Sequence, residues 1–339
     1  MLEAEFLVRR PASRVALSLS VEPGRRLGIF GPSGAGKTTA LEVLAGLVVP
    51  TSGSVRLEDV LLTDVGPHVP ATFVPPNERC IGLIAQRPQL FPHLNVRRNV
   101  LYGKGVLPME QVNTLIERLE LGSLLDERPS RLSGGQAQRV AIARTLARAN
   151  KALLLDEPFQ GLDERLRREL LDLLDELLAP LMIPVVMVAH ELELVALFAD
   201  DLVVIADGQA VGVGSVQTLL REPPTISVAS YVGYTNFFAL DRATLIGVRP
   251  DRIVPEALPR AGYVASVSIR AMRDVGTGVR FRLQLHDQEV TVTFPDDRLA
   301  TQADPQVTLL DPPVFTSDGV FVRRWIGSVI GRDGGRQGR

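Results

Sequence analysis

Apolar and polar residues follow two different periodicities in the two parts of this chain. Between about residues 26 and 208, short apolar runs alternate with helical patterns, as in a sheet with crossover helices. The runs 152–155, 185–189 and 202–206 are uninterrupted, which is typical of strands buried on both faces. We therefore predict an α/β fold for this part of the chain.

The stretch 87–149 lacks such runs and shows helical spacing throughout. We interpret it as a helical subdomain inserted into the sheet domain. After about residue 231 the pattern changes to period two, as in 279–285 and 290–294, where every second residue is apolar. Alternation of this kind, bounded by Gly and Pro, predicts a small antiparallel β-domain.

One further strand is expected over 263–270. There Tyr263, Ala265, Val267 and Ile269 would share one face. The predicted domains are thus an α/β domain over 1–232 and a β-domain over 240–328. The Gly/Arg-rich tail 331–339 is expected to be disordered.

Composition narrows the functional classes. The 339 residues are 45% apolar, enough for two domains with buried cores, and the net charge is -2. The chain lacks the excess of basic residues that a nucleic-acid-binding protein normally shows, so a nucleic-acid partner is not indicated. The single cysteine, Cys80, excludes an intrachain disulfide and is interpreted as a small apolar residue beside the strand expected at 81–84.

Membrane spans and secretion signals are also not expected. No apolar stretch reaches the ~18 residues that a spanning helix needs, and the first residues are acidic where a signal peptide is basic. We expect a soluble, cytoplasmic protein whose link to any membrane runs through partner subunits.

Residues 31–38 read GPSGAGKT between an expected strand ending at 28–30 and an expected helix over 38–47, and they match the phosphate-binding loop in full. In such a loop the glycines let backbone N–H groups converge on phosphate oxygens at a helix start. We prefer this interpretation to an ordinary glycine-rich turn because a chance match to the full pattern is rare. The candidate phosphate-binding residues are Gly31, Ser33, Gly34, Ala35, Gly36, Lys37, Thr38 and Thr39.

Two residues of this loop have specific expected roles. Lys37 would neutralise the β- and γ-phosphates, and the Thr38 hydroxyl would bind Mg²⁺. The apolar run 153–155 then ends in Asp156 and Glu157, which suits a magnesium ligand followed by a residue that activates water. Taken alone, the two acids would fit a helix N-cap equally well, and the phosphate loop upstream favours catalysis.

A second helix start has more glycine than a plain cap requires. Ser133 precedes an arginine-rich helical stretch as its expected cap, followed by Gly134, Gly135 and Gln136. The double glycine leaves N–H groups open to an anion, so contact with phosphate is indicated.

These three segments together resemble the Walker A, signature and Walker B motifs of the ABC ATPase family, in the order typical of that family. The resemblance covers residues 2–238 and implies a P-loop NTPase fold that binds ATP and Mg²⁺. By this resemblance Gln86 is the Q-loop glutamine that contacts Mg²⁺, Asp163 is the D-loop aspartate, and His190 is the switch histidine at the γ-phosphate. A histidine at a strand end can also be structural. The D-loop departs from the usual small residues at Gln160 and Gly161.

The resemblance also implies a partner. In this family two subunits pair head to tail, so Ser133, Gly134 and Gly135 would act on ATP bound by a second copy of the chain. The adenine-stacking aromatic residue typical of the family is poorly matched here. Phe6 is the candidate, with a core position as its alternative, and Arg9 or Arg10 could stack instead.

The kind of ABC protein is suggested by two further segments. Residues 86–103 resemble importer ATPases, the molybdate type most closely, and residues 247–252 resemble the TOBE (OB-like) accessory domain. This implies an ATPase at the cytoplasmic face of the membrane, bound to two transmembrane permease subunits that work with a solute-binding protein. Phe91 and Leu94 are expected at the permease contact, with core packing as the alternative. The substrate would be molybdate or another oxyanion, with sulfate, iron, sugar or polyamine as alternatives.

Two other classes stay open at this point. An ABC ATPase acting on DNA or ribosomes usually has two cassettes or a long coiled coil, and neither pattern is present. A P-loop kinase would give no reason for the segment 132–136. The β-domain is either a dimerisation platform or a site for a regulatory ligand.

Overall fold

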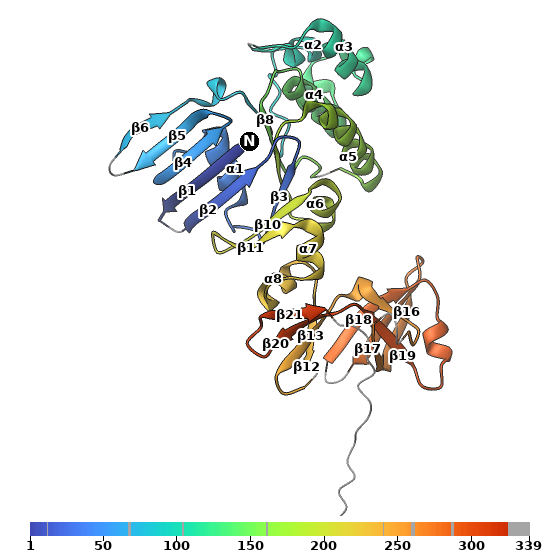
Figure 1. Ribbon diagram of the computed structural model, residues 1–339. Helices are drawn as coiled ribbons and strands as arrows, with labels where there is room; N and C mark the ends of the chain where they lie inside the picture. The colour runs from blue at the N-terminus through green and yellow to red at the C-terminus, as the bar shows by residue number, and fades with distance from the viewer. Residues whose placement is uncertain are drawn as a thin grey trace, which may run out of the picture. The chain divides into compact units, whose positions relative to one another are not determined.

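The computed structural model describes residues 1–324, except 12, 67, 68, 104, 161, 240, 259–261, 286 and 287. The predicted tail 331–339 and the D-loop Gly161 lie outside the described residues. The chain divides into two compact units, Met1–Val216 and a second one that begins at Gln217 (Figure 1). The predicted functional boundary at residue 232 stays a prediction.

The first unit is built on one mixed sheet, which has eleven strands among the described residues, in the order β6-β5-β4-β1-β2-β11-β10-β3-β9-β8-β7. Neighbours from β10 to β7 in this order are parallel, and the β1, β2, β4, β5 and β6 pairs are antiparallel. The strands are β1 (Leu2–Arg10), β2 (Ser13–Val21), β3 (Arg26–Phe30), β4 (Ser52–Leu57), β5 (Val60–Gly66), β6 (Val69–Phe73), β7 (Ile81–Ile84), β8 (Ala152–Asp156), β9 (Val185–Val188), β10 (Asp201–Ala206) and β11 (Gln209–Ser215).

The three uninterrupted apolar runs form the strands β8, β9 and β10, as predicted. Ala152, Leu153, Leu154 and Leu155 are fully buried, as expected for a strand covered on both faces. The covering helices of this unit include α1 (Lys37–Ala45), α5 (Glu164–Leu178) and α6 (Leu192–Phe198). The predicted α/β fold is confirmed.

The antiparallel part of the sheet was not predicted. Its first strand, β1, alternates strictly, with Leu2, Ala4, Phe6 and Val8 buried in the core beneath the sheet. Cys80, interpreted as a small apolar residue, is exposed instead and has a left-handed φ of 54°. The neighbouring Arg79 occupies the buried position, as described below.

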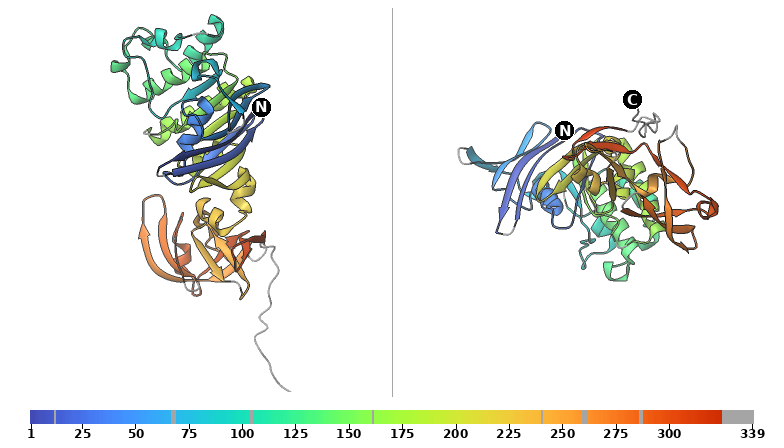
Figure 2. Two further views of the ribbon diagram at one scale, coloured as in Figure 1. Left: turned by 90° about the vertical axis from the view of Figure 1, so that its left-hand side faces the viewer. Right: turned by 90° about the horizontal axis from the view of Figure 1, so that it is seen from below.

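The insertion between β7 and β8 is helical, as predicted. It contains α2 (Val96–Val100), α3 (Met109–Arg118) and α4 (Gly134–Leu146), which gather beside one another in two views (Figures 1 and 2). The fully buried Asn99 anchors the preceding loop, because its amide oxygen accepts from Phe91 N at 2.9 Å and its amide nitrogen donates to the Phe91 and Leu94 carbonyls. Phe91 and Leu94 are both half-buried.

The second unit is all-β apart from two short helices and single turns, among the residues that the structure describes. Its sheets have the orders β12-β13-β20-β21, β14-β19-β15 and β16-β17-β18. The elements are α7 (Val216–Arg221, at the boundary), α8 (Ile226–Tyr231), β12 (Asn236–Ala239), β13 (Thr244–Val248), β14 (Ile253–Val254), β15 (Gly262–Ser266), β16 (Ser268–Asp274), β17 (Val279–Leu285), β18 (Gln288–Phe294), β19 (Gln306–Leu310), β20 (Pro313–Thr316) and β21 (Phe321–Arg324).

One strand prediction in this unit was wrong. The expected strand over 263–270 is two strands, β15 and β16, which belong to different sheets. The break is at Val267, whose N–H donates to the Pro305 carbonyl at 2.9 Å instead of joining either ladder. Val267 is nevertheless buried. Buried and exposed residues therefore alternate across the break as they would in one strand, and the sequence pattern does not reveal the break.

Candidate active site

Four neighbouring parallel strands bring the predicted motifs together. In the order β3-β9-β8-β7, the carboxyl end of each strand leads into one motif. β3 leads into the phosphate loop, β9 into His190, β8 into Glu157 and β7 into Gln86. Ligand sites of parallel α/β sheets lie at the carboxyl ends of the strands. The sheet topology therefore places the candidate residues at one edge.

The backbone of the phosphate loop requires glycine at two of its positions. A Cβ atom at Gly31 would lie 2.1 Å from the Ile205 carbonyl oxygen. One at Gly36 would lie 2.6 Å from a methyl group of Val15, and the φ of Gly36 is 102°. Gly34 also has a left-handed φ of 81°, but open space surrounds it. The first two glycines are thus explained by packing, and Gly34 by the backbone turn.

Lys37 is folded back into its own loop. Its ammonium donates to the carbonyls of Gly31 at 2.8 Å and Pro32 at 3.0 Å, and only 7% of the residue is exposed. Burial lowers the pKa of Lys37, and the Glu157 and Asp156 carboxylates oppose this shift. The ammonium is therefore held at the loop, near two carboxylates.

Two of the three predicted metal ligands, Thr38 and Asp156, interact with each other. Burial raises the pKa of Asp156, the carboxylates of Glu157 and Glu42 raise it further, and Thr38 and Lys37 oppose the rise. A nearby cation would stabilise the ionised form of an acidic group in such surroundings.

The donor set fits Mg²⁺. It consists of hydroxyl, carboxylate and amide oxygens, the ligands that this ion prefers. Within the described part of the chain, no group of three or more His, Cys, Asp and Glu residues could hold a metal. The residues therefore fit an ion bound by one carboxylate together with other oxygens, and they do not form an all-protein metal cage.

The Glu157 carboxylate is the centre of a cluster of polar side chains. Its Oε2 lies 3.2 Å from Gln86 Nε2 and 3.3 Å from His190 Nδ1. Its backbone φ of 45° is left-handed, while its N–H donates to the Val188 carbonyl at 3.0 Å. A non-glycine residue in this conformation is strained, and such strain clusters at active sites. Three predicted catalytic residues thus meet at one carboxylate.

The turn after Glu157 is firmly anchored. Phe159 is 2% exposed, and the Pro158 carbonyl accepts from the buried amide of Gln138 on α4 at 2.8 Å. The Gln160 N–H donates to the Glu157 carbonyl at 3.1 Å, which closes the turn. The Gln160 side chain then accepts a hydrogen bond from Gln86. The contacts of Gln138 and Gln160 were missed by sequence reasoning, because no spacing pattern connects them to the site.

The helix α1 that carries the phosphate loop is fixed at its other end by a buried cation, also missed from the sequence. Arg79 is 1% exposed and donates to the carbonyls of Val43 at 3.1 Å and Leu44 at 3.0 Å, in the last turn of α1. It also donates to the Val74 carbonyl at 2.8 Å and the Thr63 hydroxyl at 2.7 Å. A cation at a helix C-terminus is favourable. Burial lowers the pKa of Arg79.

The segment 133–136 starts α4 with a capping box. Gln136 N–H donates to the Ser133 hydroxyl at 3.3 Å, and Ser133 N–H donates to the Gln136 side chain at 2.9 Å. A Cβ at Gly135 would lie 2.5 Å from Leu166, whereas Gly134 faces open space. Gly135 therefore has a packing reason inside one chain, and Gly134 does not.

This segment is not joined to the phosphate loop within one chain. Among the described residues, no hydrogen bond or ion pair connects residues 133–136 with residues 31–39. Asp163 serves as the N-cap of α5, where its side chain accepts from Leu166 N at 2.9 Å.

Phe6, one candidate for adenine stacking, is a core residue. It is 3% exposed and belongs to the main apolar cluster of the first unit. Arg9 and Arg10 are exposed, and Arg10 lies 3.4 Å from the Glu42 carboxylate. The alternative that placed Phe6 in the core is therefore the one that the structure supports.

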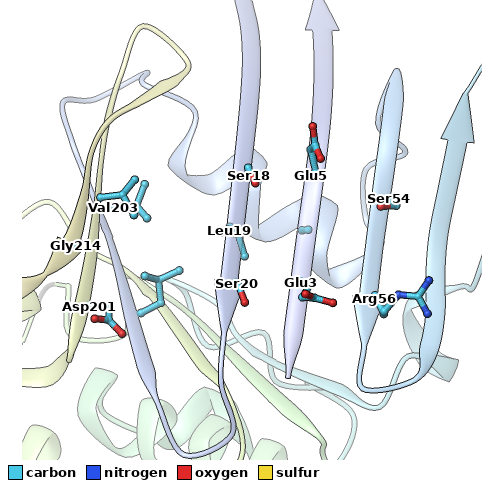
Figure 3. Close-up of a pocket in the computed structure, with 13 residues that line it drawn as sticks. Glu3, Glu5, Ser18, Leu19, Ser20, Ser54, Arg56, Asp201, Val203 and Gly214 are labelled. Carbon is cyan, nitrogen blue, oxygen red and sulfur yellow. The ribbon is translucent and has the colours of Figure 1, made fainter.

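A separate cavity of about 530 Å³ lies over the polar face of the antiparallel strands. Glu3 and Glu5 of β1, Ser18 and Ser20 of β2, and Arg56 of β4 line it (Figure 3). None of its lining residues belongs to the motifs above. It arises because the exposed positions of alternating strands share one side of the sheet.

Comparison with known proteins agrees with this arrangement. Residues 15–160 match the family described as ABC transporter. The molybdenum import ATP-binding protein ModC of Mesorhizobium japonicum is 39% identical over 265 residues, which are 74% of this chain and 70% of that protein. The chain belongs to the ABC transporter family. As a member of this family it is an ABC ATPase, and its second unit is consistent with a TOBE-like domain.

Two further similarities extend the picture of this ABC ATPase. The spermidine/putrescine import ATP-binding protein PotA of Bacillus thuringiensis is 36% identical, over 70% of this chain and 71% of that protein. A solved dimeric ATP-binding cassette in a post-hydrolysis state, bound to ADP and phosphate, matches with a TM-score of 0.52 and 25% identity. That match covers 64% of this chain and 99% of the cassette. No helix of the described residues is long and apolar enough to cross a membrane.

Proposed function

We propose that this ABC ATPase drives an importer by closing on ATP as a dimer and hydrolysing it at a site centred on Glu157. The observation that carries the proposal is the convergence of Gln86 and His190 on one oxygen of Glu157, beside the phosphate loop. The ends of four adjacent parallel strands supply these groups, so the arrangement follows from the topology of the sheet.

In this proposal the phosphate loop and its lysine bind ATP. The N–H groups at the start of α1 and the Lys37 ammonium would bind the β- and γ-phosphates. For this, Lys37 exchanges its bonds to Gly31 and Pro32 for phosphate oxygens, which bear more negative charge. Candidate contacts from the rest of the loop are Ser33, Gly34, Ala35, Gly36 and Thr39.

We assign the Mg²⁺ site to Thr38, Asp156 and Gln86, whose oxygens fit that ion. When bound, Mg²⁺ neutralises charge on the β- and γ-phosphates. The raised pKa of Asp156 supports the assignment, because burial and neighbouring carboxylates disfavour its ionised form until a cation is near.

Hydrolysis requires that a water molecule attack the γ-phosphorus while ADP leaves. Glu157 accepts the proton of that water, as a general base. Gln86 and His190 would hold the Glu157 carboxylate in place through their contacts with its Oε2. His190 would also contact the γ-phosphate.

A second copy of the chain would complete the site. Ser133, Gly134, Gly135 and Gln136 are not joined to the phosphate loop of their own subunit, and a head-to-tail partner would bring its own set to the bound ATP. Asp163 would lie near the same interface. The match to a dimeric cassette supports this arrangement.

The relatives named for molybdenum and for spermidine/putrescine import support a role in import. We infer two permease subunits as membrane partners, a solute-binding protein outside the membrane, and a place for this ATPase at the cytoplasmic face. Molybdate or another oxyanion is the favoured substrate, with sulfate, iron, sugar or polyamine as alternatives.

Uptake into vesicles that hold the assembled transporter tests the import proposal. Labelled molybdate should enter the vesicles only when ATP is present. An excess of sulfate or spermidine should reduce this uptake only if the same transporter carries that solute. Phe91→Ala provides the coupling test, because the half-buried Phe91 packs at a tilt against the exposed Tyr102, with ring centroids 4.1 Å apart. It should reduce uptake and spare the ATPase activity of the isolated subunit. Full uptake with Phe91→Ala would place Phe91 outside the permease contact.

A further inference from the structure

The amide of Gln86 has only one polar atom left over for a ligand. A glutamine amide has two N–H donors and one oxygen acceptor. Gln86 Nε2 donates to Glu157 Oε2 at 3.2 Å and to Gln160 Oε1, so both N–H groups are engaged. No described residue donates to Gln86 Oε1. The two acceptors therefore fix which end of the amide is available.

The backbone determines where Gln160 reaches. Its turn is closed by the bond from Gln160 N to the Glu157 carbonyl, and the buried Phe159 holds it in place. The Gln138 amide of α4 further binds the Pro158 carbonyl at 2.8 Å. Although the Gln160 side chain is exposed, its backbone thus belongs to a turn that these contacts hold next to Glu157.

Only one end of the Gln86 amide can bind a cation, because the –NH₂ end has no lone pair to offer. If Glu157 were the only acceptor, the amide could rotate about that single bond. A second acceptor at Gln160 removes this freedom.

We propose that Gln160 is a positioning residue that holds the Gln86 amide with Oε1 presented as the cation ligand. The inference rests on the proposed assignment of Gln86 to the Mg²⁺ site. Gln160 acts on metal affinity through Gln86 and touches neither phosphate nor metal. Removing the acceptor should weaken divalent-cation binding by about tenfold, as loss of a ligand-orienting partner typically does.

The test measures Mn²⁺ binding by the full-length protein with a non-hydrolysable ATP analogue, from the electron paramagnetic resonance signal of free Mn²⁺. Gln160→Met has a similar length but no acceptor, and Gln160→Glu keeps the acceptor oxygen. Gln111→Met, on the exposed face of α3, is the matched control. Binding of a fluorescent ATP analogue in EDTA reports on the phosphate loop without metal.

The Kd of Mn²⁺ should rise about tenfold in Gln160→Met, return to the wild-type value or below in Gln160→Glu, and stay unchanged in Gln111→Met. Metal-free nucleotide binding should be the same in all four proteins. A general structural defect would instead weaken metal-free binding, and that result would overturn the proposal. So would a Kd within twofold of wild type in Gln160→Met, or a loss that Gln160→Glu does not repair.

Gln86→Leu distinguishes the positioning role of Gln160 from the assignment of Gln86 to the metal site. If it weakens Mn²⁺ binding and Gln160→Met does not, the role of Gln160 is wrong and the metal assignment of Gln86 stands. If Gln86→Leu has no effect on Mn²⁺ binding, the metal assignment is itself wrong, and the inference about Gln160 is overturned with it.

Discussion

The Nδ1 atom of His190 lies 3.3 Å from Oε2 of Glu157, although 32 residues separate the two in the sequence. The contact exists because β8 and β9 are parallel neighbours, with Asp156 paired to Val188. Glu157 and His190 each follow one of these strands by a residue or two, so their side chains meet at the same edge. The strand register therefore produces the contact between His190 and Glu157.

The nucleotide-free fold should be more stable without the charge of Asp156. Burial and two neighbouring carboxylates raise the pKa of this residue in the folded protein. The folded state thus holds its proton to a higher pH than the unfolded chain does. Stability is lost as the pH rises through the folded pKa, and that loss persists at pH 7.

Asp156→Asn should therefore raise the unfolding temperature at pH 7 by a few degrees at most (roughly 1–4 °C), because solvent screens the charge of this half-buried group. The gain should shrink as the pH falls toward 4, and Mg²⁺-dependent ATP binding should be lost. Calorimetry from pH 4 to 8 measures the gain in unfolding temperature, with Asp172→Asn on the exposed face of α5 as control. A gain that does not vary with pH would show that charge is not its cause.

The two signature glycines should respond differently to substitution. Gly135→Ala should destabilise the protein by about 1 kcal/mol, at the low end of overpacking, because its Cβ would lie 2.5 Å from a methyl group of the half-buried Leu166. Gly134→Ala should leave stability unchanged, since no atom lies within 4 Å of the added carbon. Urea unfolding measures both.

Leu166→Ala should restore part of the stability of Gly135→Ala, because it removes the clashing methyl group. If the double variant is as unstable as the sum of the single ones, the clash is not the reason for glycine at residue 135. A fall in ATPase activity in the stable Gly134→Ala variant would then report on the dimer site alone.

Arg79 should be required for stability although it lies outside every predicted motif. Arg79→Met leaves the carbonyls of Val43 and Leu44 and the Thr63 hydroxyl without their donor in a buried site. We expect a loss of about 2–4 kcal/mol in the free energy of unfolding. Arg56→Met, at an exposed position of β4, should change it by less than about 0.5 kcal/mol. Equal effects of the two changes would contradict this account of Arg79.

The sequence predicted those parts of the fold in which apolar residues follow one another without interruption. The Ala152–Leu155 and Val185–Val188 runs are apolar at every position, so their burial on both faces was evident. β1 and β2 were missed because their alternation resembles many amphipathic segments. The break at Val267 was missed because its burial maintains the alternating pattern.

The candidate site was predictable where a motif fixes the chemistry. Lys37, Thr38, Asp156 and Glu157 were chosen from residue type and spacing, and the structure brings them together. The bond from Gln86 to Gln160 and the burial of Arg79 depend on how distant segments pack, which no local pattern encodes. The assigned roles of the site residues stay predictions until they are measured.

The central claim is that Glu157 accepts the proton of the attacking water. The most direct measurement is the rate of phosphate release from Mg-ATP by Glu157→Gln, compared with wild type at saturating nucleotide. The variant keeps size and hydrogen-bonding reach but loses the basic carboxylate, so the rate should fall by ~10²–10⁴. Mg-ATP should still bind and hold two subunits together on size exclusion, whereas Lys37→Ala should fail to bind. Hydrolysis by Glu157→Gln at a rate near that of wild type would contradict the account and leave His190 as the next candidate for positioning the water.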